Sequence, residues 1–220
     1  MTNGVSSWLL ITNLVDCYRI EYRNNIIYMP HKFSQGIPDY ATRVFKGVLF
    51  EVWQWKQKMF DGSTQTYEAV RRPDYAGIIP ILENGKFVVI EQQQPGSKAF
   101  YSFPGGRVDQ GETPETAAAR ELREEAGLAT DSLELWKQYQ PHMKYVFEVY
   151  IYIARGCRQI GIPSLPAEEK ITVHEYTFDE VIELSDQEDL FRGDGMRIDF
   201  LRAKYDKGAR EKLKRLLYST

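Results

Sequence analysis

The sequence is poor in cysteine and in long apolar runs. Its two cysteines, Cys17 and Cys157, define neither a disulfide framework nor a zinc site. Two buried or idle thiols are therefore expected, in a reducing, cytoplasmic setting. The longest apolar run near the N-terminus, residues 8–11, is too short to span a membrane. No basic segment precedes this run and no cleavage site follows it, so neither a signal peptide nor a membrane partner is expected.

The chain also lacks a surplus of either charge. Its 28 lysines and arginines against 31 acidic residues give a formal net charge of -3. Proteins that coat nucleic acid usually have a basic surplus, so nucleic acid is not an expected partner, although a small nucleotide is compatible as a ligand. With 43% apolar residues, the 220-residue chain can bury a sizeable core. This length fits one large domain, or one domain with an added subdomain.

Strand patterns lie on both sides of one acidic segment. Residues 43–60 and 64–72 are rich in β-branched and aromatic side chains around an Asp-Gly-Ser turn, which predicts a β-hairpin. The apolar stretches 75–82 and 87–94 flank Asn84-Gly85 and predict a second hairpin. Later strands are predicted at residues 133–141, 144–156 and 170–178.

Helix patterns occur three times. One helix is expected at residues 114–126, one from Thr177, where Glu180 completes a capping box, and one basic helix from about 197 to 218. The alternation of strands and helices predicts an α+β fold with helices packed on a mixed sheet. The expected organisation is an N-terminal extension at 1–40, an antiparallel β subdomain at 41–72 and the main domain at 73–220. The extension fits either a hairpin or a poorly ordered arm.

The acidic helix has clear ends. Thr113 is placed to cap it, and Pro114 at the first helical position loses no needed hydrogen bond. Gly127 occupies the C-terminal position at which glycine tolerates a left-handed conformation.

The spacing of the glutamates within this helix is unfavourable on its own. Glu121 and Glu125 are one turn apart and share a face, where like charges repel. A divalent cation between them makes the pair favourable, because Mg²⁺ takes carboxylate oxygens together with water and phosphate oxygens. Glu112 and a main-chain carbonyl at Gly105 can add ligands to the same site. A solvated acidic helix on the outside of the protein is the alternative.

The segment from Gly106 to Leu128 resembles the Nudix box, G-x5-E-x7-R-E-U-x-E-E-x-G-U, in which U is a bulky apolar residue. All nine defined positions match at fixed spacing, so a chance match is excluded in practice. The matching residues are Gly106, Glu112, Arg120, Glu121, Leu122, Glu124, Glu125, Gly127 and Leu128.

This resemblance implies an α/β/α sandwich with a mixed β-sheet and hydrolysis of a nucleoside diphosphate linked to another group, with Mg²⁺ or Mn²⁺. Carried over by motif position, the metal ligands are Glu121 and Glu125, assisted by Glu112, Glu124 and the carbonyl of Gly105. Arg120 orients the glutamates by ion pairing. A carboxylate then takes the proton of the attacking water.

The general base lies on a late loop in several Nudix branches, which here points to Glu168 and Glu169. Glu169 is slightly favoured because it borders the following strand, and Glu124 is a further catalytic candidate. Two exposed loop glutamates without a role are the alternative for Glu168 and Glu169.

The segments that flank the box resemble the ADP-ribose pyrophosphatase group, in which an N-terminal antiparallel sheet commonly helps to build a homodimer. The resemblance implies substrate contacts at Arg71, Arg72, Gln94 and Arg107. Two positions depart from the pattern of the group: Gln94 replaces the arginine of I-x-Q-x-R, and Ser102 replaces the glutamate of E-x-P. Both changes remove a charge and leave the distal group of the substrate open.

Two other functions are compatible with the sequence. The enzyme alternative is a Nudix hydrolase of an oxidised nucleoside triphosphate, a dinucleoside polyphosphate or a capped RNA. The non-enzymatic alternative is a Nudix-like protein that only binds a nucleotide or a partner, but such domains usually lose box glutamates, and all four are present here.

Overall fold

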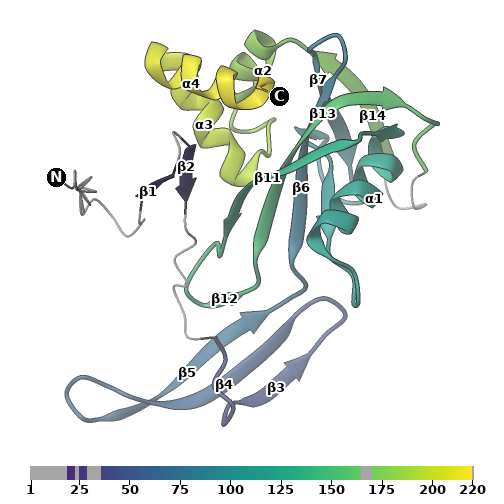
Figure 1. Ribbon diagram of the computed structural model, residues 1–220. Helices are drawn as coiled ribbons and strands as arrows, with labels where there is room; N and C mark the ends of the chain where they lie inside the picture. The colour runs from purple at the N-terminus through teal and green to yellow at the C-terminus, as the bar shows by residue number, and fades with distance from the viewer. Residues whose placement is uncertain (1–18, 23–24, 29–35, 165–169, 220) are drawn as a thin grey trace, which may run out of the picture. The chain divides into compact units, whose positions relative to one another are not determined.

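The structure is a computed structural model that describes residues 19–22, 25–28, 36–164 and 170–219. The chain divides into two units (Figure 1). Unit 1 comprises residues 1–71 and 138–146, and unit 2 comprises residues 72–137 and 147–220. Within the described ranges, no helix combines the length and the apolar character needed to cross a lipid bilayer.

Unit 1 is built from two small sheets. Strands β1 (Arg19–Tyr22) and β2 (Asn25–Tyr28) form an antiparallel pair. The second sheet has the order β12-β5-β4-β3. Its strands are β3 (Thr42–Lys46), β4 (Glu51–Lys58), β5 (Thr64–Arg71) and β12 (Tyr145–Val146). The β4–β5 hairpin confirms the hairpin predicted around the Asp-Gly-Ser turn.

Unit 2 contains one mixed sheet of eight strands in which β10, β13, β6, β7 and β14 are consecutive neighbours. Strands β13 and β6 run parallel, whereas β7 and β14 run antiparallel. Strand β8 adds to β7, β9 adds to β6 and β11 adds to β13. The strands are β6 (Tyr75–Leu82), β7 (Phe87–Gln93), β8 (Phe100–Ser102), β9 (Gly105–Arg107), β10 (Leu128–Ala129), β11 (Ser132–Tyr139), β13 (Val149–Gln159) and β14 (Lys170–Tyr176).

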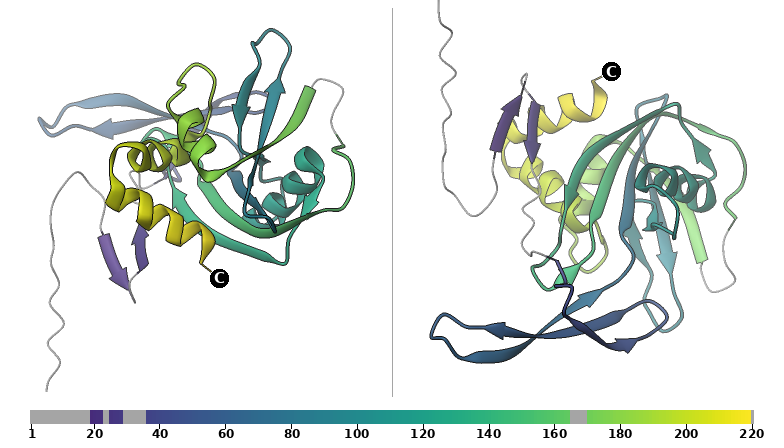
Figure 2. Two further views of the ribbon diagram at one scale, coloured as in Figure 1. Left: turned by 90° about the horizontal axis from the view of Figure 1, so that it is seen from above. Right: turned by 60° about the horizontal axis from the view of Figure 1, so that its bottom comes forward.

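Helices cover both faces of this sheet (Figure 2). Helix α1 (Pro114–Ala126) lies on one face, and the other face carries α2 (Phe178–Ser185), α3 (Asp194–Tyr205) and α4 (Lys207–Tyr218). The expected α+β sandwich, with a mixed sheet and an N-terminal antiparallel β subdomain, is confirmed. The capping box of Thr177 and Glu180 is present at the start of α2.

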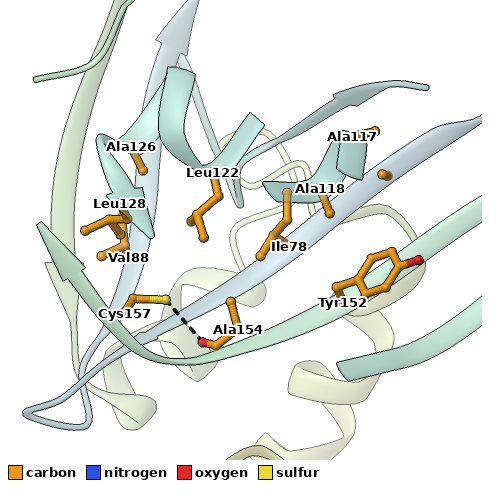
Figure 3. Close-up of a cluster of buried hydrophobic side chains, with 11 residues drawn as sticks. Ile78, Val88, Ala117, Ala118, Leu122, Ala126, Leu128, Tyr152, Ala154 and Cys157 are labelled. Carbon is orange, nitrogen blue, oxygen red and sulfur yellow. Dashed lines mark hydrogen bonds between the residues drawn. The ribbon is translucent and has the colours of Figure 1, made fainter. Parts of the chain in front are cut away.

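The core under α1 is made of small and branched side chains (Figure 3). Ala118, Leu122 and Ala126 form the buried stripe of the helix and pack with Ile78 and Val88 of the sheet. Because alanines dominate this stripe, the helix axis can approach the sheet closely. Such packing fixes the helix and therefore the carboxylates of Glu121 and Glu125, which are buried beside this stripe.

Cys157 belongs to the same cluster and is a free thiol. Its Sγ lies 3.4 Å from the carbonyl oxygen of Ala154 and donates to it (Figure 3). Burial raises the pKa of the Cys157 thiol to about 11. This thiol is structural, and Cys17 lies outside the described residues.

The core on the opposite face is aromatic. The ring of Phe87 lies 6.2 Å from that of Phe178, 6.3 Å from that of Phe200 and 5.8 Å from that of Tyr218. These rings come from β7, α2, α3 and α4, so one residue of the sheet anchors all three helices. Since Phe87 faces these helices and Val88 faces α1, side chains alternate between two cores along β7.

The prediction of a single strand at residues 144–156 was wrong. The segment divides into β12 and β13 between Val146 and Val149. The amide of Glu148 donates to Asp74 Oδ1 at 2.8 Å, and the carbonyl of Glu148 accepts from the amide of Tyr75 at 3.0 Å. The amide of Glu148 therefore bonds the Asp74 side chain instead of a neighbouring strand, and the strand is interrupted there.

The prediction of a single helix from about 197 to 218 was also inaccurate. The segment forms α3 and α4, which meet at Asp206 in an extended conformation. The Asp206 side chain accepts from the amide of Ala209 at 3.0 Å and caps α4. Capping at this residue starts a new helix instead of extending the first.

Candidate active site

Both ends of α1 are fixed as the sequence predicts. The Thr113 hydroxyl accepts from the amide of Thr116 at 3.1 Å, and the Thr116 hydroxyl accepts from the amide of Thr113 at 2.9 Å. Gly127 has φ 66°, the left-handed conformation that ends the helix. The predicted range 114–126 is confirmed.

Arg120 gathers three of the four box glutamates. Its Nε and Nη2 each lie 3.1 Å from a carboxylate oxygen of Glu112. Its Nη1 donates to Glu121 at 2.7 Å and to Glu124 at 3.0 Å. A further bond of 3.0 Å runs from Nη2 to the carbonyl of Arg107 and ties the guanidinium to β9. The box loop and the helix are thus joined through a single side chain.

Glu121 and Glu125 are the most buried of these carboxylates, with 9% and 8% exposure. The amide of Gly105 donates to Glu125 Oε2 at 2.8 Å. Gly106 leaves room for the other carboxylate, because a Cβ at this position would lie 2.5 Å from Glu121 Cδ. The two glycines therefore bring the backbone of β9 against both helix carboxylates.

The ion pair with Arg120 keeps Glu112 charged. Hydrogen bonds from Arg120 lower the pKa of the Glu112 carboxyl below its ordinary value, against the opposing effect of burial. The same bonds, foremost those to Glu112, raise the pKa of Arg120 further above its already high value. One guanidinium carries a single positive charge, so Arg120 alone does not neutralise the three carboxylates it contacts.

The chemistry of the donors fits a divalent metal ion. Carboxylate and main-chain oxygens are the ligands that Mg²⁺ and Mn²⁺ prefer. Buried carboxylates also require compensating positive charge, and Glu121 and Glu125 lie side by side on one helical face. Among the described residues, no group of three or more acidic, histidine or cysteine side chains has the arrangement of a metal site. Oxygens of Glu112, Glu121 and Glu124 are instead paired with the guanidinium of Arg120.

Two of the expected substrate contacts lie in the same unit as the box. Arg107 ends β9, is exposed and pairs with Asp109 at 2.8 Å. The guanidinium of Arg72 lies 5.0 Å from the ring centroid of Phe147. Both side chains are cations close in sequence to strands β9 and β6, which pair at Tyr75 and Arg107.

The other expected residues are placed differently. Arg71 ends β5 in unit 1, opposite Glu51. Gln94 follows β7 in an exposed turn, where its amide and carbonyl both bond Ser97. Glu168 and Glu169 lie outside the described residues.

Residues that the motif does not identify also gather near the box strands. Gln92 Nε2 donates to Ser102 Oγ at 2.7 Å between β7 and β8. Glu148, next to Asp74, has a buried Oε2 without a hydrogen-bond partner among the described residues. The departure at Ser102 was visible in the sequence, whereas the environment of Glu148 depends on the break between β12 and β13.

The NUDIX domain model matches residues 71–194, more than half of the chain. The chain belongs to the NUDIX family. It is a Nudix pyrophosphohydrolase, and enzymes of this family use divalent metal ions, in agreement with the donor set around Glu121 and Glu125.

Several curated proteins are similar to this Nudix chain. The methanol dehydrogenase activator of Bacillus methanolicus is 27% identical over 65% of this chain and 79% of its own. The ADP-ribose pyrophosphatase of Bacillus subtilis is 22% identical over 68% of this chain and 82% of its own. The ADP-ribose pyrophosphatase of Mycobacterium tuberculosis is 29% identical over 56% of this chain and 61% of its own. These similarities support the ADP-ribose pyrophosphatase branch of the superfamily.

A solved structure shares the fold. The crystal structure of an ADP compounds hydrolase superposes with a TM-score of 0.58 at 21% identity, covering 69% of this chain and 83% of that chain. At this identity the match supports the Nudix fold and does not identify the substrate.

Proposed function

We propose that this Nudix hydrolase cleaves the pyrophosphate of ADP-ribose or another nucleoside diphosphate sugar, giving a nucleoside monophosphate and a sugar phosphate. The observation that carries the reaction type is the buried pair of Glu121 and Glu125, held against the backbone of β9 beside Arg120. The substrate class is supported by the similarity to two ADP-ribose pyrophosphatases.

In this proposal, Glu121, Glu125 and the carbonyl of Gly105 hold Mg²⁺, or alternatively Mn²⁺. Glu112 and Glu124 assist them. When bound, such an ion supplies a Lewis acid that offsets phosphate charge and acidifies a coordinated water. Arg120 orients the carboxylates, because its guanidinium is already bonded to Glu112, Glu121 and Glu124.

The proton of the attacking water goes to a carboxylate that is not fully engaged by cations. We assign this role first to Glu169, with Glu168 and Glu124 as the alternatives. Glu124 is the most exposed of the three glutamates that Arg120 contacts. Exchanging each of the three for glutamine and measuring the pH dependence of kcat identifies the base, since only its loss removes the acidic limb of the profile.

Substrate binding within unit 2 is assigned to Arg72 and Arg107, whose guanidinium groups suit phosphate oxygens, and Arg71 stays a prediction from the sequence. Gln94 provides a neutral contact at a position where a charged one is common in this group. A neutral contact there selects for a distal group with hydroxyls over one with a further negative charge.

The direct test incubates the purified chain with ADP-ribose and Mg²⁺. We expect release of AMP and ribose 5-phosphate, loss of activity with a chelator, and recovery on addition of Mg²⁺ or Mn²⁺. A panel of nucleoside diphosphate sugars, oxidised nucleoside triphosphates, dinucleoside polyphosphates and capped RNA then ranks substrates by kcat/KM. Absence of turnover with every nucleoside diphosphate sugar would contradict the proposal.

The matched pair Glu125→Gln and Glu115→Gln separates the metal assignment from a general effect of charge. Both residues lie on α1, but Glu115 is exposed in the first turn. We expect Glu125→Gln to lower kcat by at least about 100-fold without unfolding the protein, and Glu115→Gln to keep the activity. Full activity of Glu125→Gln would remove this residue from the metal site.

We also propose that the protein is a homodimer in the cytoplasm. Unit 1 exposes large apolar side chains on and next to its strands, and exposed apolar surface of this kind marks interaction sites. They include Val44, Phe45, Val48 and Phe60. Light scattering after gel filtration tests the dimer, and a monomer at all concentrations contradicts it.

A further inference from the structure

A cation is stacked on the strand that precedes the box. The guanidinium carbon of Arg192 lies 3.8 Å from the ring centroid of Phe100. Phe100 is only 7% exposed, whereas Arg192 is exposed. Among the described residues, no carboxylate forms an ion pair with Arg192. One face of this guanidinium is thus covered by a ring, and its hydrogen-bond donors are not used by an acidic side chain of the described part of the chain.

The backbone around Arg192 is held by β8 and not by a loose loop. The amide of Tyr101 donates to the carbonyl of Leu190 at 2.7 Å, and the amide of Arg192 donates to the carbonyl of Tyr101 at 2.8 Å. Phe191, between them, is paired with Tyr101 in a parallel bridge and is 2% exposed. The position of Arg192 is therefore set by the sheet.

The alternation of side chains places this pair on the α1 side of the sheet. Phe191 contacts Phe103 in the aromatic core on the other side, at 5.8 Å between ring centroids. Its neighbour Arg192 points to the opposite side, as do Phe100 and Ser102 on β8. Ser102 is bonded to Gln92, which shares its face of β7 with Val88 in the core under α1.

Phe100, Ser102 and Gly105 precede the box in a fixed order along the chain. Gly105 bonds the carboxylate of Glu125, Ser102 offers a neutral hydroxyl, and Phe100 supports the guanidinium. The chain bends at Pro104 between β8 and β9, and the steps from Phe100 to Gly105 span at most about 18 Å, so both positions are within reach of one nucleoside diphosphate. Charged, neutral and planar groups therefore succeed one another, as do the diphosphate, the ribose and the base of a nucleotide.

We propose that Arg192, backed by Phe100, binds the nucleobase of the substrate. This inference rests on the proposed nucleoside diphosphate substrate and names a contact for it. A guanidinium stacks on planar rings through its open face, and its edge donates to ring nitrogens and carbonyl oxygens. The Ser102 hydroxyl, which accepts from Gln92, retains its own proton to donate to a ribose oxygen.

The test is a titration of AMP by calorimetry in Mg²⁺ with the full chain. We expect Arg192→Ala to lower the affinity for AMP about tenfold and to leave the affinity for ribose 5-phosphate unchanged, because the lost contact is to the base. Arg192→Lys keeps the charge but loses the planar stack, so we expect it to resemble Arg192→Ala. Arg202→Ala is the matched control: it removes an exposed arginine of α3 far along the chain from β8.

Phe100→Leu provides a second variant that keeps apolar volume but removes the ring. We expect this variant also to lower the affinity for AMP. Thermal unfolding checks that it is folded. For ADP-ribose, the Arg192 variants should raise KM about tenfold with little change in kcat, since a base contact is present in both ground and transition states.

The outcomes separate this inference from the proposed function. Equal AMP affinity in Arg192→Ala and wild type, or no AMP binding by wild type, overturns the base contact. An equal loss of ribose 5-phosphate affinity also overturns it, because Arg192 would then bind phosphate. A chain that binds AMP through Arg192 but hydrolyses no nucleoside diphosphate sugar contradicts the proposed function alone.

Discussion

At the scale of single residues, the box carboxylates differ in what holds them. Glu112 and Glu124 depend on Arg120, Glu125 also bonds the amide of Gly105, and Glu121 lies where Gly106 has no side chain. Their mutual repulsion is reduced by a shared guanidinium and by backbone donors. The same contacts orient the oxygens for a cation.

Gly106→Ala tests the close approach of β9 and α1. The added Cβ would lie 2.5 Å from Glu121 Cδ, so the carboxylate or the strand must move. We expect a loss of about 1–3 kcal/mol in the free energy of unfolding and of about 100-fold in kcat. Gly161→Ala is the control, because a Cβ there meets no atom within 4 Å. Unchanged kcat in Gly106→Ala would show that Glu121 does not need its observed position.

The Glu112–Arg120 pair predicts a dependence of stability on pH. Because the folded pKa of Glu112 lies below its ordinary value, the pair stabilises the folded state above about pH 4.5 and loses this effect as the pH falls through the folded pKa. We expect the difference in urea midpoint between wild type and Glu112→Gln to shrink between pH 6 and about pH 3. A constant difference over this range would contradict the assignment of the shift to Arg120.

At the scale of elements, α1 is the part of the site that is specified most completely by neighbouring residues in the sequence. Its capping residues, its alanine stripe and its terminal glycine all lie within the 15 residues from Thr113 to Gly127. Each agrees with the others, so the helix and its register follow from the sequence. Packing of Leu122 against the sheet then fixes which side carries the carboxylates.

Thr113→Ala tests the capping box at the start of α1. It removes the acceptor for the amide of Thr116, and we expect a loss of about 1 kcal/mol in the free energy of unfolding. Thr113→Ser keeps the hydroxyl and should lose less than half of this. Equal effects of the two changes, measured by urea unfolding, would indicate that the methyl group and not the cap is responsible.

At the scale of the whole molecule, the sheet of unit 2 separates two cores of different character. Small residues under α1 allow a close approach, whereas the rings of Phe87, Phe103 and Phe200 fill the wider space beneath α2–α4. The aromatic core also carries Phe191, and with it the position of Arg192. Packing on one side of the sheet thus sets a candidate substrate contact on the other.

Phe200→Ala tests the aromatic core. Phe200 has 0% exposure and contacts Phe87, Phe103 and Phe178, so we expect a loss of about 3–5 kcal/mol in the free energy of unfolding. Ile162→Ala, at a position with 88% exposure, should change it by less than about 0.5 kcal/mol. Similar losses of unfolding free energy for both variants, measured by urea unfolding, would contradict the assignment of Phe200 to the stabilising core.

Much of the fold was predictable because its signals are local. The hairpins at Asp61 and Asn84 and the helix at 114–126 were predicted from turn residues, caps and periodicity. The split of residues 144–156 was not, because it depends on the carboxylate of Asp74, which lies 74 residues before Glu148. The start of α4 was missed although its cap, Asp206, is a local signal.

The sequence by itself determined the reaction class, because the box is a run of 23 residues in which residue type and helical spacing together define the carboxylates. Only the tertiary structure decided how these carboxylates are held and which distant residues join them. Arg120 reaches Glu112 and the carbonyl of Arg107 because β9 and α1 pack together. Arg192 meets Phe100 because the chain returns to pair with β8, a long-range contact that no local pattern specifies.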